Sequence, residues 1–224
     1  YYTADGLDTA LDTAEAHAAF AAYIAQYQDL GFPISANFFS RFRTGEMPIG
    51  FVDYAGYLQI LTAAPELAGK WALAPVPGRE REDGTIDRTA AGLTGTADML
   101  LSAAEDREAC WTFLKWWMSA DTQTSYGQEL ESRLGASARP ATAEMTAFAR
   151  LPWGSETRAA IRAYQQSAVA VPNVLGGVIT ARAVSNAADA ALYSGYTPRE
   201  ALETAVRAIR DELHRKQELY QIAG

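Results

Sequence analysis

RFRTGEMPIGFVDYAGYLQILTAAPELAGKWALAPVPG, residues 41–78, is the segment whose pattern predicts the fold. A charged helix end stops at Gly45, and a short apolar run follows from Met47 to Val52. A helical turn then leads to the Ala64–Pro65 break. A second apolar run, Trp71 to Val76, stops at Pro77–Gly78. Helix, strand, helix and strand in close succession indicate an α/β unit.

Three polar and aromatic residues follow the first of these predicted strands: Asp53, Tyr54 and Tyr57. Open α/β sheets bind their ligands just beyond the carboxyl ends of the strands. We therefore expect these three side chains to lie at a ligand-binding edge.

Composition narrows the class of protein. The chain has 224 residues, 49% of them hydrophobic, with 19 basic and 27 acidic side chains and a net charge of −8. A packed globular chain fits this composition, and the lack of a basic surplus argues against nucleic acid or an anionic membrane as the main partner. The single cysteine, Cys110, allows no disulfide within the chain and no cysteine-based metal site.

The rest of the chain is mostly helical by its periodicity. A further extended run is expected at 90–101, giving about eight helices against three or four short strands. The fold class is thus a helix-rich α/β unit, and residues 1–224 are expected to form one unit. Further helices are predicted at 9–30, 35–44, 102–118, 121–132, 141–147, 155–168, 178–193 and from Thr197 onward.

Two helix starts carry capping-box signatures, Ser102 with Glu105 and Thr197 with Glu200. In the helix expected after Ser102, the stripe of Cys110, Phe113 and Trp117 at helical spacing is typical of core packing.

A search for catalytic motifs leaves a binding site as the better interpretation. The sequence has no G-x-S-x-G, Walker or G-x-G-x-x-G motif, and its two histidines have no ligand-spaced partners, so neither a metal nor a cofactor is expected. What remains are aromatic and hydrogen-bonding residues at the ends of elements, which suit a site that binds without reacting. A purely structural role for each of them stays open. The candidate ligand-binding residues are Asp53, Tyr54, Tyr57, Thr94, Arg139 and Trp153.

Four segments, taken in order, resemble a known family. They are FFSRFRTGEMPIGFVDYAGY (38–57), APELAGKWALAPVPG (64–78), LLSAAEDREACWTFLKWWMSADTQTSYG (100–127) and SGYTPREALETAVRAIRDEL (194–213). Together they resemble the carboxyl-terminal part of the extracellular solute-binding proteins of ABC importers, the group that binds sugars and oligosaccharides.

The resemblance implies a type II periplasmic-binding-protein-like fold, whose two lobes close on a solute. Residues 1–224 would supply the carboxyl-terminal lobe plus crossover helices, with an amino-terminal lobe and a signal sequence expected to precede them. It also implies a non-enzymatic role, delivery of a carbohydrate to membrane permease subunits, and an extracellular or periplasmic location, with or without a membrane tether in the preceding segment.

Two other classes of function remain open. A polysaccharide-processing enzyme module would need two carboxylates roughly 5–10 Å apart in one pocket, with Glu46, Asp53 and Asp98 as candidates. A helical protein-interaction module would show a contiguous exposed apolar patch and no cleft.

Overall fold

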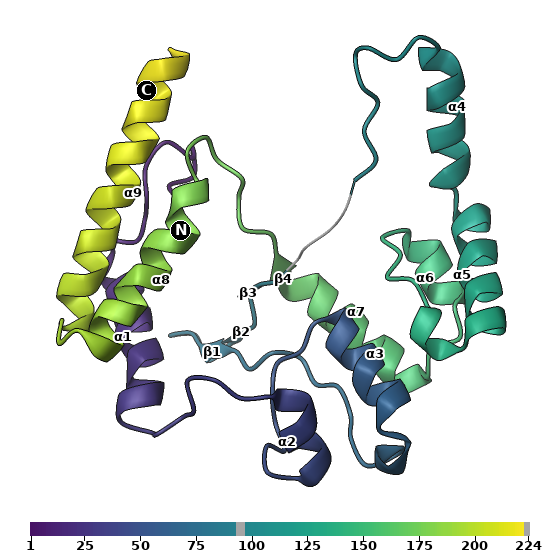
Figure 1. The fold of residues 1–224 in the computed structure, drawn as a ribbon, viewed down its shortest axis with the longest axis horizontal. Helices are drawn as coiled ribbons and strands as arrows, with labels where there is room; N and C mark the ends of the chain where they lie inside the picture. The colour runs from purple at the N-terminus through teal and green to yellow at the C-terminus, as the bar shows by residue number, and fades with distance from the viewer. Residues whose placement is uncertain (93–96, 222–224) are drawn as a thin grey trace. The chain divides into compact units, whose positions relative to one another are not determined.

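The computed structural model describes residues 1–92 and 97–221, and within them the chain is mostly helical with a few short strands (Figure 1). In this described part there are nine α-helices; the helix content is 57% and the strand content 4%. The chain divides into two compact units. The first unit joins Tyr1–Ala36 to Val171–Gly224, and the second unit is Asn37–Ala170.

The first unit consists of three helices: α1 (Ala14–Gln28), α8 (Val178–Tyr193) and α9 (Pro198–Tyr220). Buried alanines recur every fourth residue along α8, so its backbone can approach the larger side chains of α9 closely. The buried core comprises Phe20, Ile24, Ala183, Ala187, Ala191, Ala201, Leu202, Ala205, Ile209 and Leu213.

The residues before α1 are tied to this helical core by polar contacts. Arg210 of α9 donates to Asp8 at 2.9 Å and to Asp12 at 2.8 Å. The hydroxyl of Tyr2 donates to Oγ1 of Thr180 in α8 at 2.8 Å. The amino-terminal segment therefore packs on the two carboxyl-terminal helices of the same unit.

The second unit contains the remaining elements. Its helices are α2 (Phe38–Thr44), α3 (Tyr54–Ala63), α4 (Arg107–Trp117), α5 (Ala120–Leu134), α6 (Met145–Arg150) and α7 (Ser155–Ser167), with 3₁₀ turns η1 (Pro65–Leu67) and η2 (Ala136–Ala138). Its strands are β1 (Arg79–Glu80), β2 (Ile86–Asp87), β3 (Ala90–Ala91) and β4 (Ala168–Val169). β1 pairs antiparallel with β2, and β3 pairs parallel with β4.

The predicted strands at 47–52 and 71–76 are wrong, because neither segment has strand structure. A strand exists only where a neighbouring chain accepts and donates its backbone hydrogen bonds, and Pro48 has no N–H to donate. The extended run predicted at 90–101 is a strand only at Ala90–Ala91, and residues 97–101 have no regular structure. Among the described residues, the strands pair in two-residue ladders, and Tyr2 and Thr9 form an isolated antiparallel bridge.

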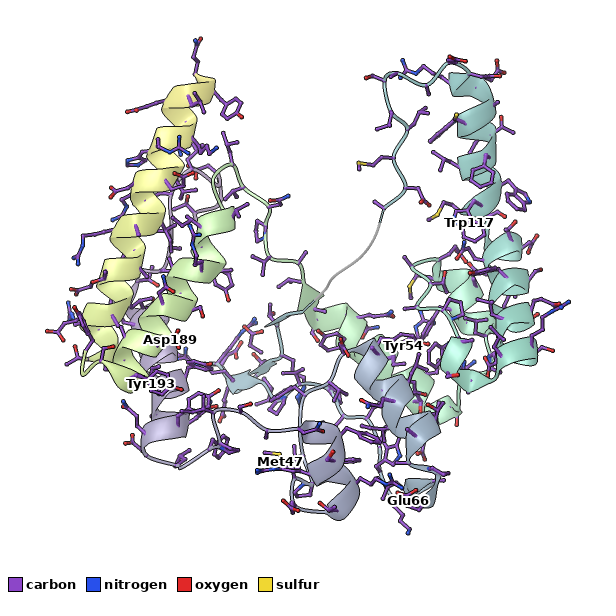
Figure 2. All side chains as sticks on the ribbon, in the orientation of Figure 1. Met47, Tyr54, Glu66, Trp117, Asp189 and Tyr193 are labelled. Carbon is purple, nitrogen blue, oxygen red and sulfur yellow. The ribbon has the colours of Figure 1, made fainter. Side chains whose placement is uncertain are left out.

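The helix containing Cys110 also differs from the prediction. It begins after Asp106, whose carboxylate accepts from the N–H of Ala109 at 2.9 Å, and Ser102 is not its cap. The stripe predicted to be core is not buried: Cys110 and Phe113 are exposed, and no residue of α4 is buried. Periodicity specified an apolar face but not what covers it. Figure 2 labels Trp117 at the end of this helix.

Local signals were more successful in the first unit. Helix α8 spans the predicted residues 178–193. At the start of α9, Thr197 accepts from the N–H of Glu200, and the Glu200 carboxylate accepts from the N–H of Thr197. The predicted capping box is therefore confirmed. Within residues 1–92 and 97–221, none of the helices combines the length and apolar character needed to cross a membrane.

Leu213 provides a direct test of the core of the first unit. It is 0% exposed on α9, whereas Leu219 on the same helix is 60% exposed. We expect Leu213→Ala to lower the free energy of unfolding by about 2–5 kcal/mol, because it removes buried methyl groups and leaves a cavity. The matched Leu219→Ala change should alter it by less than about 0.5 kcal/mol. Urea unfolding of both variants measures the difference, and equal losses would contradict this assignment of the core.

Candidate binding site

Four of the six predicted site residues come together in the second unit. Tyr54, Tyr57 and Trp153 pack their rings against one another, and the Arg139 guanidinium lies over Trp153. Figure 2 labels Tyr54 in this region. Ring centroids are 5.9 Å apart for the two tyrosines and 6.0 Å apart for Tyr54 and Trp153. These residues, far apart in sequence, are called the aromatic cluster below.

The amino-terminal turn of α3 positions both tyrosines. Asp53 is extended, and its carboxylate accepts from the N–H of Gly56 at 2.8 Å, so that the helix begins at Tyr54. Tyr54 and Tyr57 are three residues apart, which places them on one face of the helix. Asp53 itself is exposed and caps the helix. Among the described residues, its carboxylate makes no hydrogen bond to a side chain of the aromatic cluster.

The residues on either side of Arg139 set its backbone conformation. Helix α5 ends at Gly135, whose φ of 83° is a conformation that favours glycine, and η2 then leads to Arg139. Because Pro140 follows, Arg139 is restricted to an extended backbone, with φ −61° and ψ 122°. In this conformation its carbonyl accepts a 2.9 Å hydrogen bond from the Tyr54 hydroxyl.

The Arg139 guanidinium is paired with Glu131, one turn before the end of α5. Nε donates to Oε2 at 2.7 Å and Nη2 donates to Oε1, which makes the pair bidentate. The Arg139 side chain is 7% exposed and that of Glu131 is 17% exposed. The hydrogen bonds to Glu131 raise the pKa of the Arg139 guanidinium above its ordinary value. On one face, the Arg139 Cζ atom lies 4.6 Å from the centroid of the Trp153 ring, within the range of a cation–π contact.

Trp153 lies between α6 and α7, directly after Pro152, and is only 7% exposed. Its ring packs on Phe148 of α6 at a centroid distance of 5.1 Å. Among the described residues, its buried indole Nε1 has no hydrogen-bond acceptor. Nη1 of Arg139 likewise donates to no acceptor in the described part of the chain. The buried indole N–H of Trp153 is therefore left without an acceptor among the described residues, a costly arrangement for a buried group.

A glycine lets α5 approach the other segments of the cluster. A Cβ at Gly127 would lie 2.7 Å from Cδ2 of Leu151 and 3.2 Å from Cγ of Pro140. Both residues adjoin the segments that carry Trp153 and Arg139. Gly127 thus sets the close packing that brings Glu131 within reach of Arg139.

Sequence reasoning found part of this cluster and missed part. Thr94 lies outside the described residues. Glu131, Phe148 and Trp71 were missed, and Trp71 packs on Tyr57 at a centroid distance of 5.9 Å. For Trp71 and Phe148, aromatic character next to a break or a turn could have been a signal. For Glu131, nothing in its local sequence distinguishes it from other carboxylates on helices.

Two surface hollows in the second unit lie elsewhere. One, of about 530 Å³, lies along α4, and another, of about 320 Å³, lies between α2 and α3. Neither hollow is lined by a predicted site residue. The rings of the aromatic cluster pack against one another within their unit. Asp106, Glu108, Ala109, Thr112, Phe113 and Trp116 line the larger hollow.

No group of three or more His, Cys, Asp or Glu side chains is placed to hold a metal ion in residues 1–92 and 97–221. Comparison with known proteins found no matching family model and no matching curated protein.

Burial of Tyr54 predicts a pH dependence. Loss of solvent around its hydroxyl raises the pKa of Tyr54 to about 12, against about 10 in an unfolded chain. Because the folded-state pKa is the higher one, the stabilisation is complete below pH about 10 and is lost as the pH rises to about 12. The free energy of unfolding in urea, measured across this range, should fall more steeply for the parent protein than for Tyr54→Phe.

The comparison between the two proteins isolates Tyr54, because the pKa of Tyr23 is also raised, chiefly by its hydrogen bond to Tyr27, and contributes equally to both. Identical alkaline slopes for the parent and Tyr54→Phe would show that the Tyr54 hydroxyl is not buried as described.

Proposed function

We propose that this chain is the substrate-binding component of an ABC import system and that it captures a carbohydrate, an oligosaccharide, for delivery to membrane permease subunits. The proposal includes a helix-rich lobe of a type II periplasmic-binding-protein-like α/β fold and an extracellular or periplasmic location. It rests on the ordered resemblance of four sequence segments and on the composition of the aromatic cluster.

One observation carries the proposal: Tyr54, Tyr57, Arg139 and Trp153, chosen from sequence as sugar-binding candidates, converge on one cluster. Aromatic faces combined with a few hydrogen-bonding groups suit recognition of sugars, whose rings have apolar faces and hydroxyl rims. Nη1 of Arg139, which donates to no acceptor among the described residues, is available to donate to a sugar hydroxyl oxygen.

In the proposed site, Tyr54, Tyr57 and Trp153 supply the aromatic surface. Tyr54, only partly buried, offers the most accessible ring, and Tyr57 and Trp153 would contact the sugar through their remaining exposed edges. Arg139 and Asp53 would hydrogen-bond hydroxyl groups, and Thr94 would add a further contact.

The enzyme alternative has less support. Acid–base hydrolysis of a glycoside needs two carboxylates facing one pocket. Glu46, Asp53 and Asp98 are all exposed, and none of them lies in the aromatic cluster. The carboxylate that does lie beside the cluster, Glu131, is occupied by its bidentate pair with Arg139.

Thermal unfolding in the presence of mono- and oligosaccharides tests the proposal. A sugar that binds only the folded protein adds about 2.7 kcal/mol at a hundredfold excess over its Kd and so raises Tm. Tyr54→Leu removes the most exposed ring of the cluster, and we expect it to weaken binding of that sugar by about three- to tenfold, the value of one aromatic contact. Tyr193→Leu, which removes an exposed tyrosine from α8, is the matched control and should leave the affinity unchanged.

A rise in Tm with peptides or another solute, and none with any sugar, would support the role in import but contradict the proposal that the solute is a carbohydrate. Release of shortened sugars by the same sample would instead favour the enzyme. Equal affinities for the parent and Tyr54→Leu would remove Tyr54 from the proposed site.

A second function, protein interaction, is favoured by the exposed surface of α4. Trp111, Phe113, Trp116 and Met118 are each about half exposed there, and Phe113 packs on Trp116 at a centroid distance of 5.6 Å. Exposed aromatic side chains that pack on each other, as Phe113 and Trp116 do, mark interaction surfaces.

If α4 is such a surface, the protein should self-associate as its concentration rises, because contact between copies removes these rings from water. The double change Phe113→Ser and Trp116→Ser should then reduce the mass measured by light scattering at high concentration, without lowering Tm. A monomeric parent over the whole concentration range would argue against self-association through α4.

A further inference from the structure

A bidentate ion pair borders the aromatic cluster, and its two charges cancel. Glu131 engages Nε and Nη2 of Arg139, both side chains are largely buried, and Arg139 covers one face of Trp153. The Arg139 carbonyl also accepts from the Tyr54 hydroxyl. Arg139 therefore contacts two of the rings proposed to bind the sugar, and Glu131 contacts Arg139.

We propose that Glu131 is a positioning residue for the binding surface and that, by neutralising Arg139, it makes the surface select uncharged sugars over acidic ones. This inference rests on the proposed function, because it concerns the selectivity of that same site. Glu131 acts through Arg139 and needs no contact with the solute.

The positioning role follows from the cost of burying a charge. A guanidinium that is 7% exposed would be strongly unfavourable without a counter-ion, and removing one partner of such a pair leaves the other uncompensated. The long arginine side chain can escape by extending its charged end toward water. Glu131 therefore keeps the guanidinium over Trp153, because its two oxygens match the two N–H groups of the arginine fork.

The selectivity follows from the same contact. With Glu131 in place, an incoming carboxylate meets a compensated pair and the negative charge of Glu131 itself, so it gains little attraction from Arg139. A neutral hydroxyl oxygen can still accept from Nη1, the guanidinium nitrogen that Glu131 does not engage. Removing the Glu131 charge alone should therefore favour acidic sugars.

The test compares Glu131→Gln with Glu129→Gln in the intact protein. Glu129 lies on the same helix and pairs with Arg133, but both of these side chains are well exposed, so the control removes an equal charge away from the cluster. The probes are matched pairs of sugars, glucose with glucuronate, galactose with galacturonate and mannose with mannuronate, together with short oligomers of each. Affinities come from calorimetric titration.

We expect Glu131→Gln to raise the affinity ratio of acidic to neutral sugar by about tenfold, the lower end of the value of a hydrogen bond to a charged group. Glu129→Gln should leave the ratio unchanged. The double change Glu131→Gln with Arg139→Gln, which removes both charges, should return it to the parent value. An unchanged ratio in a folded Glu131→Gln protein would overturn the selectivity.

A second readout needs no ligand. Near-ultraviolet circular dichroism of the free protein should change in Glu131→Gln but not in Glu129→Gln. When Trp153→Phe is present in both the parent and the Glu131→Gln protein, their spectra should no longer differ. Glu131→Asp keeps the charge and should restore part of the signal. A Glu131→Gln spectrum identical to that of the parent would overturn the positioning role.

The two readouts separate the two hypotheses. If no sugar binds the parent protein, the proposed function fails and the selectivity fails with it, while the spectra still decide whether Glu131 positions Arg139 over Trp153. If Glu131→Gln does not fold, the double change and Glu131→Asp supply the same comparisons. The supporting result is then a parent-like acidic-to-neutral affinity ratio in Glu131→Asp, together with a changed near-ultraviolet circular dichroism spectrum in the double change.

Discussion

The buried positive charge of Arg139 is the constraint from which the packing of the second unit can be understood. A guanidinium removed from water must find a carboxylate, and Glu131 is brought within reach because α5 ends at Gly135 and the chain turns back through η2. The carbonyl of the same arginine anchors Tyr54 at the start of α3, and its guanidinium covers Trp153 beyond α6. One residue therefore connects three segments that are distant in sequence.

The first unit is held by a different kind of force. Its core is almost entirely aliphatic, and α8 and α9 pack through small and branched side chains, as expected for burial that is proportional to apolar area and not directional. The polar contacts of this unit lie at its edge, where Arg210 pairs with Asp8 and Asp12. Apolar packing tolerates conservative changes, whereas the bidentate geometry around Arg139 does not. A precisely shaped binding surface is thus better built in the second unit.

Local chemistry explains which parts of the fold were predictable. Thr197, Pro198 and Glu200 specify a helix start through contacts within one turn, so the start of α9 could be read from sequence. The apolar run from Met47 to Val52 looks like a strand, but strand structure depends on a partner that no local pattern encodes, and the run is irregular. The stripe on α4 failed for a related reason, because helical spacing of apolar residues shows that a face exists without showing that anything packs on it.

The candidate site shows the same division between local and distant information. Tyr54 and Tyr57 were chosen because they follow a strand, and that strand does not form; they share a face because Asp53 caps their helix. Their aromatic chemistry was readable, since it belongs to the residues themselves. The charge state around Arg139 was not, because it depends on a glutamate eight residues earlier that only the turn at Gly135 brings into contact. Sequence could therefore suggest a sugar, while the proposed preference for a neutral over an acidic sugar rests on a pairing that exists only in the folded chain.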